Sequence, residues 1–208
     1  MGLYFWFWGA LLAVLALCES FATITVRMLD AVVLAAGCLG LVVGSRRLHQ
    51  VRAMGESWSR RTREALVAAA LLAYLCPIFL MWRRLPANMY LLGHTLAFFA
   101  LLCYLLTSVC QITAAIGRAA GRRALVMQSI LFGTLAVVVL FPPFALLAQF
   151  MILAARDNHD PLNLVQFWLG RVPPWLVFAP LLPVALTLAP VWTAKDIVLQ
   201  RLLTARDG

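Results

Sequence analysis

The sequence predicts an all-α, polytopic integral membrane protein with about six transmembrane helices and short interfacial helices. The chain is 64% hydrophobic and only 12% charged over 208 residues, whereas a soluble domain typically has roughly 25% charged and 45–50% apolar residues. Its apolar segments are also long and unalternated, unlike the ~10-residue alternating segments of a membrane β-barrel. No change of composition marks a linker, so residues 1–208 are predicted to form a single transmembrane helical domain.

The predicted spans follow from the lengths of the apolar segments, since a transmembrane helix needs about 20 such residues. They cover residues 3–19, 28–44, 65–82, 90–116, 124–154 and 175–193. The first span begins with an aromatic run, residues 4–8, which is expected to lie at the level of the lipid head groups. Residues 19–30 form either an outer loop or partly the start of the second span.

Proline positions predict irregularities in the later spans. Pro77 is expected to kink the third span. The fifth span is too long for a bilayer and has Pro142 and Pro143 in its middle, so a strong tilt or a break is expected. After the fifth span, Asp160 and Pro161 suit an N-cap and a first helical residue, which predicts a short outer interfacial helix.

An arginine-rich segment, Ser45–Glu64, separates the second and third spans and predicts the orientation. Its arginines are Arg46, Arg47, Arg52, Arg60, Arg61 and Arg63. An excess of Lys and Arg in a short loop marks the cytoplasmic side of a membrane. With this segment inside, twelve of the 17 basic residues lie on the inner side. We therefore predict a bacterial-type inner membrane protein with both termini in the cytoplasm.

Two sequence patterns predict a helix at the membrane interface and a contact between two helices. Within the arginine-rich segment, apolar residues at helical spacing predict a short amphipathic helix at the inner interface. These residues are Leu48, Val51, Met54 and Trp58. In the second span, small residues four apart predict a face that lets another helix approach closely. These residues are Ala36, Gly40 and Gly44.

The candidate site is a polar pocket near the outer leaflet. Its predicted members on the first, second and fourth spans are Glu19, Arg27, Asp30 and His94. Ionisable residues at membrane depth are costly and mark functional sites by default. The alternative is that they lie in the head-group zone, with Arg27 and Asp30 paired one helical turn apart.

A polar stripe on the fourth span extends this candidate site. It comprises His94, Tyr104, Ser108 and Gln111. At 100° per residue these side chains share an arc of about 100°. The stripe lines either a cavity or an interface at which helices hydrogen-bond to each other.

No cofactor or metal is predicted. The five cysteines form no CxxC pair, and zinc and iron–sulfur sites need closely spaced ligands. His94 is the only histidine within a span, so the chain cannot hold a bis-histidine haem by itself, and the alternative is that it donates one ligand to a site shared with another subunit. Phosphate-binding loops and hydrolase motifs are absent from the sequence.

The predicted partners are membrane lipids and other integral membrane subunits in a hetero-oligomer. The formal net charge is +9, which in a soluble protein would suggest nucleic acid. Here the arginines of the basic segment are interpreted as topological signals and as contacts to lipid head groups or a partner. No nucleic acid is predicted.

The leading functional hypothesis is a non-catalytic subunit that scaffolds a larger inner-membrane complex. The segments outside the predicted spans are too short to form a domain, and the polar content suits helix packing better than chemistry. One alternative is the permease half of a transporter energised by a separate ATPase, by analogy of topology alone. The other is a quinone- or lipid-handling membrane enzyme that uses the outer polar cluster.

Overall fold

The computed structural model describes residues 1–22, 28–51, 55–157, 171 and 181–204. The prediction of an all-helical fold is confirmed for these residues, which contain no strand. In chain order the helices are α1 (Gly2–Ala22), α2 (Met28–His49), α3 (Glu56–Trp82), α4 (Met89–Ala119), α5 (Arg123–Arg156) and α8 (Leu181–Thr204).

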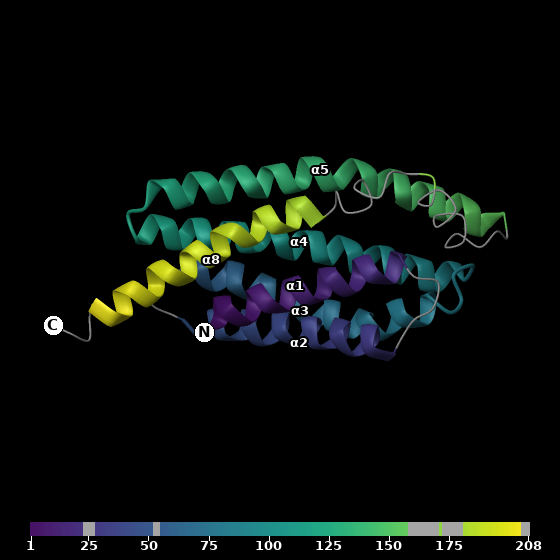
Figure 1. Cartoon of the computed structure of the whole chain (residues 1–208), viewed down its shortest axis with the longest axis horizontal. Coiled ribbons are helices and arrows are strands. Elements are labelled where there is room, and N and C mark those ends of the chain that lie inside the picture. The colour runs from purple at the N-terminus through teal and green to yellow at the C-terminus, as the bar shows by residue number, and fades with distance from the viewer. Residues whose placement is uncertain (23–27, 52–54, 158–170, 172–180, 205–208) are drawn as a thin grey trace.

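The helices form an elongated bundle in which neighbours in the chain are neighbours in space (Figure 1). Helix α2 packs between α1 and α3, α3 packs against α4, and α4 packs against α5. Helix α8 crosses the bundle and contacts α1, α4 and α5. The N terminus, the α2–α3 connection and the α4–α5 turn lie at one end of the bundle, which we call the N-terminal end. The α3–α4 turn lies at the opposite end.

Three helical segments are long and apolar enough to cross a membrane. They are Leu29–His49, Glu56–Trp82 and Met89–Ala119. The described parts of two other helices contribute shorter apolar stretches, Gly2–Leu17 and Arg123–Val139. The structure is therefore that of a helical protein compatible with a membrane, and the number of six crossings stays a prediction.

The arginine-rich segment is more helical than predicted. Helix α2 continues to His49 and α3 begins at Glu56, so most of the segment belongs to these two helices. The separate amphipathic helix predicted there is not present in the described residues. Its Leu48 belongs to α2 and its Trp58 to α3, and Val51 is exposed in the connection. The remaining member, Met54, lies outside the described residues.

Leu48 and Trp58 are both buried, and a hydrogen bond joins them across the connection between α2 and α3. The Nε1–H of Trp58 donates to the backbone carbonyl of Leu48 at 3.3 Å. The same carbonyl also accepts from the backbone N–H of Val51 at 3.2 Å, so the indole is its second donor at the end of α2. The spacing of these apolar residues therefore reflects a contact between two helices.

Prolines interrupt neither α3 nor α5. Pro77 lies inside α3, which continues to Trp82, and α5 runs as one helix through residues 142 and 143. The break predicted in the fifth span is therefore absent. Neighbouring helices and local adjustments re-satisfy the backbone groups that a proline frees within membrane helices. The outer interfacial helix predicted after Asp160 lies outside the described residues.

The aromatic run at residues 4–8 is split between the interior and the surface. Trp6 is buried at 1% exposure, and Phe7 packs against Trp192 of α8 with ring centroids 5.1 Å apart. The run therefore holds α1 inside the bundle, in addition to presenting exposed rings at the bundle's N-terminal end.

Candidate functional site

Asp30 and Arg83 are both buried, and the charge of Asp30 acts on the Arg83 guanidinium. Asp30 lies in the first turn of α2 and is 3% exposed, and Arg83 follows the last residue of α3 and is 5% exposed. Burial lowers the pKa of the Arg83 guanidinium, and the charge of Asp30 opposes this shift. Because α2 and α3 are antiparallel neighbours, the start of one lies beside the end of the other.

The rest of the predicted pocket around Asp30 is only partly described. The side chain of Glu19 and the whole of Arg27 lie outside the described residues. The predicted Arg27–Asp30 pair is therefore not observable. Among the described residues, Arg83 is close enough for its charge to interact with that of Asp30.

His94 is bonded to its own helix. Its Nδ1–H donates to the backbone carbonyl of Tyr90 at 2.8 Å, and the two rings lie 4.4 Å apart. Helix α4 packs against α3, α5 and α8, whereas α2 packs against α1 and α3. His94 and Asp30 thus lie on helices that α3 separates.

The polar stripe of α4 does not line one cavity. Ser108 is buried, whereas Tyr104 is 44% exposed and Gln111 is exposed. Tyr104 alone among the four stripe residues lines the groove described next. These side chains span an arc of about 100° around α4, which is wide enough to include both the packed side and the open side of the helix.

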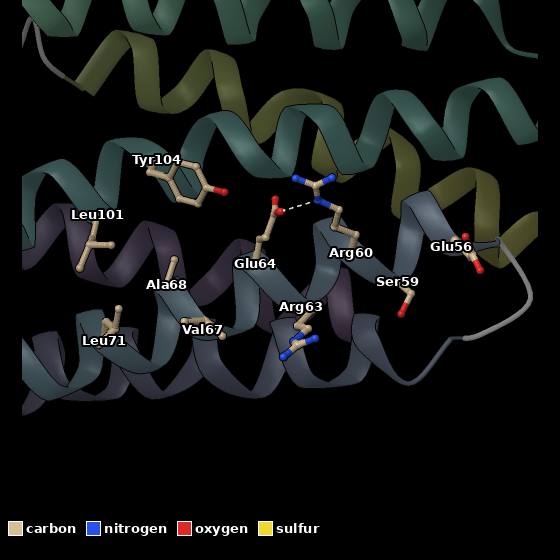
Figure 2. A pocket seen from close by; sticks show the side chains of 10 residues that line it. All are labelled: Glu56, Ser59, Arg60, Arg63, Glu64, Val67, Ala68, Leu71, Leu101 and Tyr104. Carbon is tan, nitrogen blue, oxygen red and sulfur yellow. Dashed lines mark hydrogen bonds and ion pairs between the residues drawn. The ribbon is translucent and has the colours of Figure 1, made fainter.

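A groove of about 720 Å³ lies between α3 and α4 (Figure 2). Its polar end, near the start of α3, is lined by Glu56, Ser59, Arg60, Arg63 and Glu64. Its apolar end is lined by Val67, Ala68, Leu71, Leu101 and Tyr104. The polar end lies at the N-terminal end of the bundle, and the apolar end extends toward the middle of α3. Of the residues predicted for the polar pocket, Tyr104 lines this groove, and Arg60 and Arg63 were predicted as contacts to lipid head groups or a partner.

The groove follows from the order of side chains along α3. The first turns of α3 are charged and the later turns are apolar, so one helix face changes from polar to apolar along its length. Ala68 lies in the groove, where its single methyl group leaves room that a larger side chain would fill. Arg60 Nε and Glu64 Oε1 form an ion pair at 2.9 Å across one turn.

The described arginines of the basic segment gather at the bundle's N-terminal end. Arg46 and Arg47 are exposed on the last turn of α2, where positive charge is favourable beside the helix C-terminus. Arg60 and Arg63 are exposed on α3 and Arg61 is half-buried. Arg52 lies outside the described residues.

The small-residue face of α2 contacts α1 of the same chain. A Cβ added to Gly44 would lie 2.7 Å from the backbone nitrogen of Trp6, and one added to Gly40 would lie 2.9 Å from the Cα of Gly9. Gly37 belongs to the same contact, because its added Cβ would lie 2.6 Å from the nitrogen of Ala13. Ala36, the third residue of the predicted face, is exposed.

Within the described residues, no three His, Cys, Asp or Glu side chains are grouped so that they could hold a metal ion. Buried Cys38 on α2 and Cys76 on α3 are free thiols.

The chain has no significant match among protein-family models, curated proteins or solved structures.

Proposed function

We propose that this chain is a non-catalytic integral membrane subunit that scaffolds a larger inner-membrane complex. The observation that supports this role best is the exposed apolar face of α5. Helix α5 packs against α4 and α8, and its exposed residues include Met127, Leu131 and Val138, at 72%, 62% and 62%. Spacings of four and seven residues put these side chains on one face, which suits contact with a further membrane helix.

The length of α5 supports the same proposal. Its 34 residues extend over about 51 Å, against about 30 Å for the hydrocarbon core of a bilayer. Apolar side chains stay exposed as far as Leu153. A steep tilt or a neighbouring subunit would keep this surface out of water.

Polar side chains in the bundle support a structural role. The hydroxyl groups of Thr113 on α4 and Ser129 on α5 hydrogen-bond to each other at 3.0 Å, in a buried position. Hydrogen bonds of this kind stabilise the association of membrane helices by roughly 0.6 kcal/mol on average. The polar groups of Thr113, Ser129 and His94 therefore bond to the chain itself.

We further propose six crossings with both termini in the cytoplasm. The alternation of the described helices, together with the arginines of α2, α3 and the α4–α5 turn at the N-terminal end, supports this orientation. The opposite end has fewer basic residues in the described chain, among them Arg83, Arg84 and Arg156.

Labelling of single cysteines tests this orientation. In a cysteine-free variant, Ala87→Cys in the α3–α4 turn is expected to react with an impermeant maleimide in intact spheroplasts. Arg122→Cys in the α4–α5 turn is expected to react only after lysis, because the positive-inside rule places that turn in the cytoplasm. Both residues are exposed. Reaction of Arg122→Cys in intact spheroplasts would reverse the orientation.

Photocrosslinking tests the subunit role. A photoreactive amino acid at Met127, Leu131 or Val138 is expected to form an adduct with one and the same membrane protein. The matched control is Tyr74, which is 69% exposed on α3 and is expected to form lipid adducts only. Lipid adducts alone at all four positions would contradict the role that we propose for α5.

A further inference from the structure

We propose that the groove between α3 and α4 binds one phospholipid with a phosphoethanolamine head group. The lipid would come from the leaflet at the N-terminal end of the bundle, which holds the polar end of the groove. This inference requires that the chain lies in a membrane, and it is independent of the scaffolding role.

The polarity of the groove matches one lipid molecule from head group to acyl chain. Charged and hydroxyl side chains line the end nearest the start of α3, between Glu56 and Glu64. Beyond Glu64 the lining is apolar as far as Leu71, a further rise of about 10 Å along the helix. This is the order in which a phospholipid entering from that leaflet presents its head group and its hydrocarbon chain. A soluble polar ligand would leave the apolar half of the groove unfilled.

The guanidinium of Arg63 is available to bind the phosphate of the phospholipid. This side chain is exposed in the groove and makes no hydrogen bond or ion pair with the described residues. Ser59 lies one turn before it on α3, and both side chains are seen on the same side of the helix in Figure 2. A guanidinium and a neighbouring hydroxyl are suitable donors for phosphate oxygens.

The acidic residues distinguish between classes of head group. Two arginines and two glutamates line the groove, so its formal charges cancel. The Arg60–Glu64 pair has side chains 83% and 45% exposed, and such surface pairs are weak enough to exchange partners. Glu56 makes no hydrogen bond or ion pair within the described chain. The adjacent, opposite charges of Arg60 and Glu64 match a zwitterionic head group, whose ammonium donates to carboxylate while its phosphate accepts from arginine.

An anionic phosphatidylglycerol would match the arginines but would place its charge beside two glutamates. A phosphatidylcholine would match both signs of charge, but its quaternary ammonium has no N–H to donate. Phosphatidylethanolamine satisfies both requirements. Comparing these three lipids therefore distinguishes attraction to negative charge, matching of both charges, and hydrogen bonding by the ammonium.

Native mass spectrometry of the full chain tests the proposal. The purified protein would be mixed with equal amounts of phosphatidylethanolamine, phosphatidylcholine and phosphatidylglycerol that have identical acyl chains. We expect phosphatidylethanolamine to be retained about tenfold more than either competitor, as a charge-assisted hydrogen bond would produce. Retention of phosphatidylglycerol at an equal or higher level, or of no lipid, would overturn the proposal.

Two variants locate the binding. Arg63→Gln is expected to reduce phosphatidylethanolamine retention about tenfold, whereas Arg47→Gln, an exposed arginine on α2 outside the groove, should leave it unchanged. Glu64→Gln should abolish the preference over phosphatidylcholine without reducing total binding of zwitterionic lipid. All three positions are exposed, so the fold should tolerate the changes. Equal losses for Arg63→Gln and Arg47→Gln would show attraction by net charge and would refute the groove as the site.

Discussion

Asp30→Asn is expected to destabilise the folded protein by about 3 kcal/mol, because it removes a negative charge that favours the charged form of the buried Arg83 guanidinium. Arg83 is 5% exposed, and burial already disfavours its charged form. The upper reference for such a loss is the removal of one member of a buried ion pair, which typically costs about 3–5 kcal/mol. We expect the lower part of this range because Arg83 lies at the end of α3, where a long side chain can reach toward water.

The measurement is reversible unfolding in mixed micelles, followed by far-UV circular dichroism as the denaturing detergent increases. The matched control is Arg84→Met, because Arg84 is the next residue in the chain and is exposed. The double variant Asp30→Asn/Arg83→Met should lose less stability than the sum of its single variants, since neither charge is then left buried alone. Strict additivity in this cycle would contradict the pairing.

Gly37→Ala is expected to separate α1 from α2 and to destabilise the protein by about 2–3 kcal/mol, as overpacking of a tight core does. The new Cβ would lie 2.6 Å from the backbone nitrogen of Ala13 and 2.9 Å from the carbonyl oxygen of Gly9. Both atoms belong to the backbone of α1, so no rotation of a side chain relieves the contact. The α1 and α2 helices must move apart, which removes the close packing that stabilises a pair of membrane helices.

Gly93→Ala is the matched control for this substitution. Gly93 also lies within a helix, α4, and an added Cβ there would meet nothing within 4 Å. It is expected to change stability by no more than the difference in helix propensity, about 0.5–1 kcal/mol in favour of Ala. The same detergent unfolding experiment compares the two variants. Equal stabilities for Gly37→Ala and Gly93→Ala would mean that α1 and α2 do not approach closely.

The helices themselves were predictable from the sequence. Long apolar segments predict helices, because a backbone in lipid must satisfy its hydrogen bonds internally. Three of the described helices are long and apolar enough to cross a membrane. The spacing of Gly40 and Gly44 also indicated a face for close packing, although the neighbouring contact is made by Gly37 and Ala36 is exposed. Arg46 and Arg47 at the end of α2 and the arginines at the start of α3 lie at one end of the bundle, which followed in the same way from the order of the helices.

Only the tertiary structure decided which side chains meet. In a soluble helix, an apolar stripe identifies the face that packs inward. A membrane helix is apolar on every side, because lipid is as apolar as leucine, so the sequence does not distinguish a packed face from a lipid-facing one. The burial of Trp6, the pairing of Asp30 with Arg83, and the groove between α3 and α4 all depend on which helices are neighbours. That choice is made by the shapes of whole helix faces, which the order of residues along one span does not express.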